Sequence, residues 1–193
     1  LAYACRYAGQ LRRSIELYQQ ARALNTDYDI SLSAERQSAK AEIYLGQYDA
    51  ALERYAAIRD LLAAHGDAPD EKVLFYEGLT HLYKGNEQRA VQLFDASVRR
   101  QPDSLWSRFA SGYKLAALGR RDELIELARK LEQDDVADGE RRYRLVHFFS
   151  LVGDSGRALQ HLAATLEAGN FNYPYISNDP LLGELRQSPG YGA

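Results

Sequence analysis

Small and large apolar residues recur along the chain at fixed distances from a series of glycines. The glycines are Gly9, Gly46, Gly85, Gly119 and Gly153. A small residue stands five positions after most of them, as in Ser14, Ala51, Ala90 and Ala158. A larger one stands nine positions after most of them, as in Tyr18, Tyr55, Phe94 and Leu162. Residues four apart share one face of a helix, so the pattern predicts an amphipathic helix after each glycine.

The spacing of the glycines predicts a second helix before each of them. The intervals between successive glycines are 37, 39, 34 and 34 residues. An interval of 34 residues is the length of a helix–turn–helix repeat, and the two longer intervals indicate loop insertions. Each glycine is expected at the turn, where a positive φ is often needed. Polar residues that follow the glycines are expected to cap the second helices, namely Asp49, Asn86, Asp122 and Asp154.

This pattern resembles the tetratricopeptide repeat, a 34-residue helix pair. The clearest copy contains Leu74, Gly78, Gly85, Ala90, Phe94 and Pro102. The resemblance covers roughly residues 1–169 and implies an all-α fold, a right-handed αα superhelix of about five helix pairs. The implied repeats span approximately residues 1–30, 31–70, 71–104, 105–138 and 139–169. Because the first copy lacks the start of its first helix and the chain contains no Met, we expect further sequence upstream.

The repeat pattern stops at Gly169, and residues 170–193 are expected to form a C-terminal cap. Pro174 and Pro180 forbid one continuous helix through this segment. Asp179 and Pro180 are expected to begin a short apolar helix from Leu181 to Leu185. The segment resembles those that follow tetratricopeptide arrays in bacterial signalling proteins. Covering the exposed apolar face of the last repeat is its expected role, because terminal repeats need a cap; ligand binding is the alternative.

Two positions in each first helix, ten and six residues before the glycine, lie on one helix face. In tetratricopeptide arrays such positions line the concave groove. They are occupied here by Arg36, Lys40, Phe75, Leu79, Phe109, Tyr113, Tyr143 and His147. The predicted groove is basic in the second copy and aromatic from the third to the fifth. It would suit a peptide with apolar anchors and an acidic end. The alternative is that the aromatic residues only pack the helices together.

Charge and composition narrow the class of partner. The net charge of −3 argues against a generic nucleic-acid-binding protein, which would carry a basic stripe. The longest apolar stretch, 145–152, is too short to cross a bilayer, so no membrane insertion is expected. Cys5 is the single cysteine, so no intrachain disulfide can form. A cytoplasmic location is expected, with the periplasm left open.

The sequence contains no pattern typical of a catalytic, cofactor or metal site. There is no nucleophile elbow, phosphate-binding loop or zinc-protease motif, and the four histidines lack metal-ligand spacing. We therefore predict a non-catalytic protein–protein interaction scaffold that binds a peptide or partner protein in its concave groove. The resemblance implies a part of a larger bacterial regulatory or signalling protein. The alternatives are a self-association element, giving a homo-oligomer, and an accessory domain of an upstream enzyme such as a kinase or cyclase.

Overall fold

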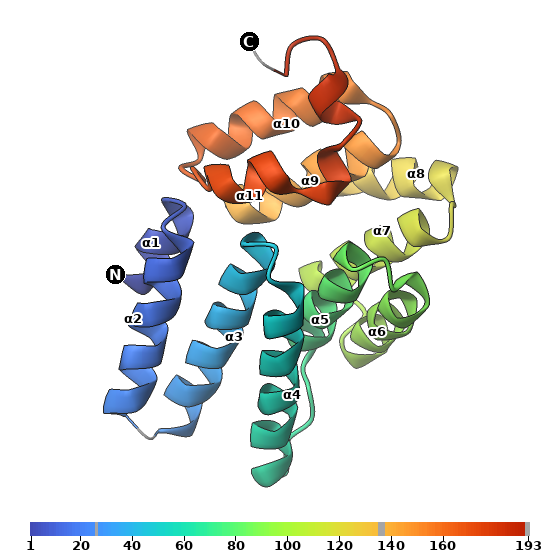
Figure 1. Ribbon diagram of the computed structural model, residues 1–193. Coiled ribbons are helices and arrows are strands. Elements are labelled where there is room, and N and C mark those ends of the chain that lie inside the picture. Colours follow the sequence, from blue (N-terminus) through green and yellow to red (C-terminus); the bar gives the residue numbers. More distant parts are fainter. Residues whose placement is uncertain (26, 135–137, 192–193) are drawn as a thin grey trace.

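The computed structural model describes residues 1–25, 27–134 and 138–191, and over these residues the chain is helical without any strand. Consecutive helices pack as pairs along a curved array (Figure 1). The pairs are α1 (Ala2–Tyr7) with α2 (Leu11–Leu24), α3 (Tyr28–Tyr44) with α4 (Tyr48–Ala64), α5 (Glu71–Tyr83) with α6 (Glu87–Arg100), α7 (Leu105–Ala117) with α8 (Arg121–Glu132), and α9 (Gly139–Leu151) with α10 (Ser155–Glu167). The prediction of an all-α solenoid of helix pairs is confirmed.

The turn within each pair contains one of the recurring glycines. All five have a positive φ, between 66° and 77°, which residues with a Cβ adopt only under strain. The glycine spacing in the sequence therefore marks real turns. None of the described helices has both the length and the hydropathy that a bilayer crossing requires.

Two of the four residues predicted to cap the second helices are N-cap residues, and one of these two forms a capping hydrogen bond. Asp154 accepts a hydrogen bond from the backbone N–H of Arg157 at 3.1 Å. Asn86 is the N-cap residue of α6, but its side chain forms no capping hydrogen bond. Asp49 and Asp122 lie inside the first turns of α4 and α8, so the prediction that they are N-caps is wrong. Their negative charges still favour the positive end of the helix dipole.

Apolar side chains fill the space between neighbouring pairs, and two glycines let the helices approach closely. Phe75 in α5 lies 6.3 Å from Phe109 in α7, measured between ring centroids, and both rings are buried. A Cβ placed on Gly78 would lie 2.8 Å from the ring of Phe94, and one placed on Gly112 would overlap the ring of Phe148. Both glycines thus occupy positions where any side chain would force the helices apart.

The array winds until its last pair contacts its first. Arg6 in α1 forms a buried ion pair with Glu140 in α9, and the hydroxyl of Tyr7 donates to Asp138 at 3.0 Å. The α1–α2 turn lies against the C-terminal segment, since a Cβ placed on Gly9 would be 2.9 Å from Cδ of Pro174. Figure 1 shows α1 beside α9 and α11. The inner face of the solenoid is therefore enclosed.

The C-terminal segment contains α11 (Tyr173–Asn178) and two 3-10 turns, η1 (Pro180–Leu182) and η2 (Leu185–Gln187). The prediction of one helix over Leu181–Leu185 is wrong, because the chain leaves helical hydrogen bonding between the two turns. The helix α11 was not predicted. Pro174 is its second residue, where a missing N–H costs no helical hydrogen bond.

Candidate functional site on the inner face

The structure places the eight predicted groove residues in three different surroundings. Phe75, Leu79 and Phe109 are buried in the apolar core between helix pairs. Tyr113, Tyr143 and His147 are buried in a polar cluster at the centre of the ring. Arg36 and Lys40 line a cavity near this cluster. Seven of the eight are thus buried, and of the two that line the cavity only Arg36 is partly exposed.

The polar cluster is built around one face of α9. Four residues of this helix have the spacing i, i+3, i+4 and i+7 and are all buried: Glu140, Tyr143, Arg144 and His147. Asp138 fixes the start of the helix by accepting the backbone N–H of Arg141 at 2.9 Å. We use the name inner hub for these four residues together with the side chains that contact them or are hydrogen-bonded to those side chains: Arg6, Lys40, Tyr44, Tyr83, Tyr113, Tyr175 and Asp179.

Glu140 gathers the hydrogen bonds at one side of the inner hub. Its carboxylate accepts from Nζ of Lys40 at 2.6 Å, from the guanidinium of Arg6 and from the hydroxyl of Tyr44. Burial raises the pKa of Glu140, but the two cations outweigh burial and lower it to about 2. Burial in turn lowers the pKa of Lys40 to about 8, against the opposing effect of Glu140. Glu140 is therefore a charged residue that joins the first, second and last helix pairs.

Asp179, which belongs to the C-terminal segment, accepts the hydrogen bonds at the other side of the inner hub. Its Oδ2 accepts from Nε2 of His147 at 2.7 Å and from the hydroxyls of Tyr143 at 3.2 Å and Tyr83 at 3.3 Å. Burial raises the pKa of Asp179, but the facing His147 and the donated hydrogen bonds hold it below its usual value. Burial lowers the pKa of His147, so we assign a neutral imidazole whose Nδ1 accepts from the hydroxyl of Tyr113.

Arg144 lies between these two carboxylates and is fully buried. Its hydrogen bonds go to three tyrosine hydroxyls, at 3.1 Å to Tyr175 and at 3.4 Å to Tyr44 and to Tyr113. None of the described carboxylates forms an ion pair with it, and its Nε has no hydrogen-bond partner. Burying a guanidinium without a directly bonded counter-ion is energetically costly, which marks this position as a candidate for recognition.

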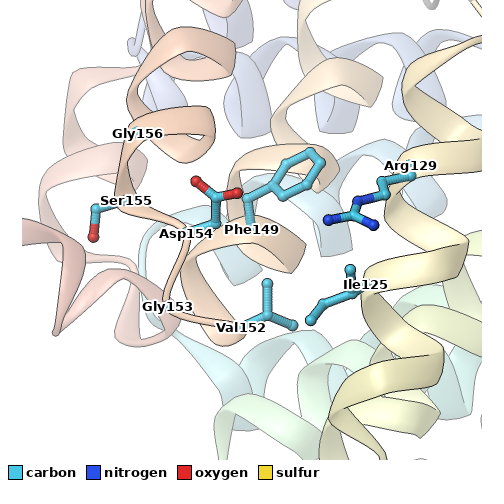
Figure 2. A pocket seen from close by; sticks show the side chains of 8 residues that line it. All are labelled: Ile125, Arg129, Phe149, Val152, Gly153, Asp154, Ser155 and Gly156. Carbon is cyan, nitrogen blue, oxygen red and sulfur yellow. The ribbon is translucent and has the colours of Figure 1, made fainter.

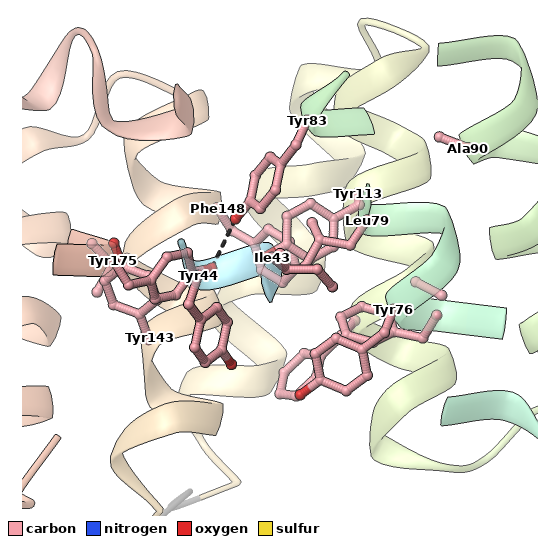
Figure 3. Packing of buried hydrophobic residues seen from close by; sticks show 14 of the residues in the cluster. Ile43, Tyr44, Tyr76, Leu79, Tyr83, Ala90, Tyr113, Tyr143, Phe148 and Tyr175 are labelled. Atoms are coloured by element: carbon pink, nitrogen blue, oxygen red, sulfur yellow. Dashed lines mark hydrogen bonds between the residues drawn. The ribbon is translucent and has the colours of Figure 1, made fainter. Parts of the chain in front are cut away.

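Figure 3 shows how the aromatic rings converge on the inner hub. The ring of Tyr175 stacks on that of Tyr44, with centroids 4.0 Å apart. The dashed line in the figure is the hydrogen bond between the hydroxyls of Tyr83 and Tyr175, 2.8 Å long. His147 and Asp179 form a pair of a kind used in acid–base chemistry. Here both side chains are fully buried, and tyrosine hydroxyls form hydrogen bonds with each of them.

A cavity of about 170 Å³ opens beside the inner hub. Its lining comprises Arg36, Gln37, Lys40, Tyr55, Lys72, Val73, Tyr76 and Trp106. Nζ of Lys40 lies 4.8 Å from the ring centroid of Tyr76, a cation–π distance. Three polar atoms of the lining are buried without a hydrogen-bond partner among the described residues: Nε of Arg36, Oε1 of Gln37 and the hydroxyl of Tyr76. Basic and aromatic side chains therefore meet here with unused hydrogen-bonding capacity.

A larger and more open cavity, about 440 Å³, lies between α8 and the α9–α10 turn. Figure 2 shows its lining, in which Ile125, Phe149 and Val152 lie near Arg129 and Asp154. None of the buried, unpartnered polar atoms of the described residues belongs to this lining. The described residues also contain no group of three or more His, Cys, Asp or Glu side chains arranged to hold a metal ion. The cavity beside Trp106 is thus the stronger candidate.

Sequence reasoning missed Glu140, Arg144 and Asp179, which organise the inner hub. For the first two, a signal was present: charged residues at the helical spacing of Tyr143 and His147 share the face predicted to look inward. For Asp179, the sequence predicts only a place at the start of a short helix, before Pro180. It does cap η1, accepting the N–H of Leu181 at 3.0 Å, but its second oxygen serves the inner hub.

Neither a known family model nor a curated protein sequence matches this chain. Similarity does extend to solved structures. A tetratricopeptide repeat protein from Parabacteroides merdae is 19% identical over 97% of this chain and 69% of its own, with a TM-score of 0.56. A putative kinesin light chain from Podospora anserina, with nearly identical TPR-like repeats, is 18% identical over 86% of this chain and 90% of its own, with a TM-score of 0.53. Together with the five helix pairs among the described residues, these similarities show that the chain has the tetratricopeptide-repeat fold.

Proposed function

We propose that this protein is a non-catalytic interaction scaffold that binds a partner peptide with acidic and apolar side chains at the cavity beside Trp106. The observation that carries the proposal is the combination of cations, aromatic rings and unpartnered polar atoms in its lining. Solenoid repeats commonly present such inner surfaces to partner proteins. Among the described residues of the inner face, this combination borders a cavity beside Trp106, whereas the cations Arg6 and Arg144 of the inner hub are fully buried.

The chemistry of the lining defines the kind of peptide. Lys72 is exposed. Arg36 already pairs with Asp70 at 3.1 Å, but its Nε has no hydrogen-bond partner among the described residues, so both side chains can donate to an incoming carboxylate. Trp106 and Tyr76 provide ring faces for an apolar or aromatic anchor, of the type that dominates binding energy at interfaces. A volume of about 170 Å³ accommodates one large side chain, with the rest of the peptide lying outside.

Of the eight predicted groove residues, this proposal uses Arg36 and Lys40 directly. The other six, Phe75, Leu79, Phe109, Tyr113, Tyr143 and His147, are interior residues. They would support the cavity by packing, and direct contact with a partner would require the C-terminal segment to move. Their role in binding stays a prediction.

The single tryptophan makes the proposal testable without a label, because Trp106 lines the cavity. The probes are ten-residue synthetic peptides that alternate Glu with Phe or Leu, and matched peptides with Lys in place of Glu. We expect the acidic set alone to change the fluorescence of Trp106 and to bind in calorimetry. The variant Arg36→Glu/Lys72→Glu should weaken binding at least tenfold, whereas Arg99→Glu/Arg100→Glu on exposed positions of α6 should not. Equal binding of both peptide sets, or equal binding by both variants, would contradict the proposal.

The wider context is a second part of the proposal, supported by the family resemblance. The chain would serve as a regulatory or signalling part of a larger bacterial protein in the cytoplasm, a location that its single buried Cys5 suits. Self-association is the alternative, since the apolar side chains of Leu1, Phe171 and Tyr173 are exposed. Molecular mass measured by light scattering across a hundredfold range of concentration distinguishes the two, because a constant monomer mass excludes self-association.

A further inference from the structure

We propose that the inner hub is a second peptide-binding site, which the chain's own C-terminal segment (residues 170–191) occupies as an internal ligand. A partner segment that carries a tyrosine four residues before an aspartate would compete for this site. The two sites share Lys40, but the anchors of this inference, Tyr175 and Asp179, do not line the cavity beside Trp106, so the peptide test of each proposal can fail without that of the other.

The C-terminal segment enters the inner hub through two side chains, Tyr175 and Asp179. The ring of Tyr175 lies on that of Tyr44, and its hydroxyl receives a hydrogen bond from Arg144 at 3.1 Å. The carboxylate of Asp179 receives one from His147 at 2.7 Å, with further ones from two tyrosine hydroxyls. Both side chains are almost wholly buried. This is a pair of side-chain anchors buried among the first helices of the repeats, an arrangement typical of a bound peptide.

The groups that receive these anchors come from the first helices of successive pairs. Tyr44 lies in α3, Tyr83 in α5, Tyr113 in α7, and Arg144 and His147 in α9. They form one continuous inner surface, whereas the anchors arrive from a segment outside the repeats. The division into a receptor surface and an inserted segment therefore follows the boundary of the repeat array.

A few residues after Asp179, the same segment covers the apolar end of the repeat array with leucine side chains. Leu182 and Leu185 are buried, with η1 against α9 and η2 against α10. Apolar burial of this kind accounts for capping. Capping does not explain why the carboxylate of Asp179 and the phenol of Tyr175 are inserted into the inner hub. Buried polar contacts add little net stability compared with apolar packing, and they chiefly specify which groups meet.

The site is also incompletely satisfied by its present occupant. Arg144 donates its hydrogen bonds only to neutral tyrosine hydroxyls, and its Nε remains unpartnered among the described residues. Around the inserted segment, Phe171 and Tyr173 remain 60% and 75% exposed. A competing segment with the same two anchors and better complementarity to Arg144 could therefore replace the C-terminal segment.

The test uses the full chain with a protease recognition sequence inserted after the exposed Phe171, so that cleavage leaves the segment in place without a covalent tether. The probe is a fluorescent synthetic peptide with the sequence of residues 172–193. We expect the cleaved protein to keep its helical circular dichroism and to exchange its segment for the probe. Probes with Tyr175→Ala or Asp179→Asn should bind at least tenfold more weakly. The matched control Tyr173→Ala, on an exposed side chain of the same helix, should bind within twofold of the unaltered probe.

Three results would overturn the proposal: no exchange at any excess of probe, equal loss for Tyr173→Ala and Tyr175→Ala, or loss of helicity on cleavage despite excess probe. A second measurement needs no insertion. In the uncleaved chain, Asp179→Asn should bind the unaltered probe at least tenfold more tightly than the wild type does, because the tethered occupant is weakened. Equal binding by the two folded proteins would contradict the proposal, and if Asp179→Asn does not fold, the exchange experiment decides.

Discussion

The interface between α5 and α7 differs from the inner hub in two ways: in the chemistry of its contacts and in how far apart in the sequence the contacting residues are. Phe75 and Phe109 meet through apolar rings and are separated by one repeat length. Arg6 and Glu140 meet through charge and are 134 residues apart in sequence, and Lys40 and Glu140 are 100 apart. Apolar contacts between neighbours build each step of the solenoid, whereas the polar contacts fix where its two ends meet. Local stacking and ring closure are therefore separable properties of this chain.

The largest effect should come from removing the central charge of the inner hub. Glu140→Gln leaves Arg6 and Lys40 buried without their counter-ion, and breaking a buried ion pair in this way costs roughly 3–5 kcal/mol of unfolding free energy. Urea denaturation measures the change. The control is Glu123→Gln in the exposed pair with Arg120, for which a change within about 0.5 kcal/mol is expected. A similar small change at Glu140 would mean that the ring contact does not form.

The same residue should make the protein sensitive to acid. The folded-state pKa of Glu140 is lowered from 4.5 to about 2, so its contribution to stability is complete above pH 4.5 and is lost as the pH falls to about 2. Asp179, whose pKa is also lowered, acts in the same direction at the lower end of this range. Urea midpoints should fall more steeply between pH 5 and pH 3 for the wild type than for Glu140→Gln. Parallel curves would contradict this assignment.

A smaller effect is expected where local stacking alone is disturbed. Gly112→Ala places a Cβ against the buried ring of Phe148, and overpacking of this kind costs about 1–3 kcal/mol. Gly156→Ala, in α10, meets no atom closer than 3.8 Å and should be neutral or stabilising by up to about 1 kcal/mol, given the higher helix propensity of alanine. Thermal or urea unfolding of the two variants compares them. If both behave alike, the close approach of α7 and α9 is not present.

The smallest expected difference separates two turns with the same backbone conformation. Gly9→Ala and Gly46→Ala both place a Cβ at positive φ, which costs about 1–2 kcal/mol. Only Gly9 faces another segment, with Cδ of Pro174 at 2.9 Å from the added Cβ. Gly9→Ala should therefore be less stable than Gly46→Ala by a further ~1 kcal/mol. Equal unfolding free energies would indicate that the first turn does not touch the C-terminal segment.

The sequence predicts the stacking of neighbouring helix pairs far better than it predicts the inner hub. Gly46, Gly85 and Gly119 recur because each turn needs the same backbone conformation, so one rule finds all of them. The inner hub has no such repetition. Glu140 is paired with Arg6 only because the rotations from one helix pair to the next add up and bring α9 to α1. No local sequence pattern predicts the total rotation.

The residues of the candidate site also differ in how well the sequence predicts them. Arg36 and Lys40 were found by their register relative to Gly46, since positions ten and six residues before each turn share one face. Tyr143 and His147 form hydrogen bonds with Asp179, which comes from a segment outside the repeats. Register predicts which way a side chain points, but it does not predict what another segment brings to meet it.

The most direct test of ring closure is a double-mutant cycle between Arg6 and Glu140. Unfolding free energies are measured in urea for the wild type, Arg6→Met, Glu140→Gln and the double variant. Because the two side chains form one buried ion pair, their effects should be non-additive, with a coupling energy above ~1 kcal/mol. Additivity within about 0.5 kcal/mol would show that the first and last helix pairs do not meet, and it would contradict the enclosed inner face on which both proposed binding sites depend.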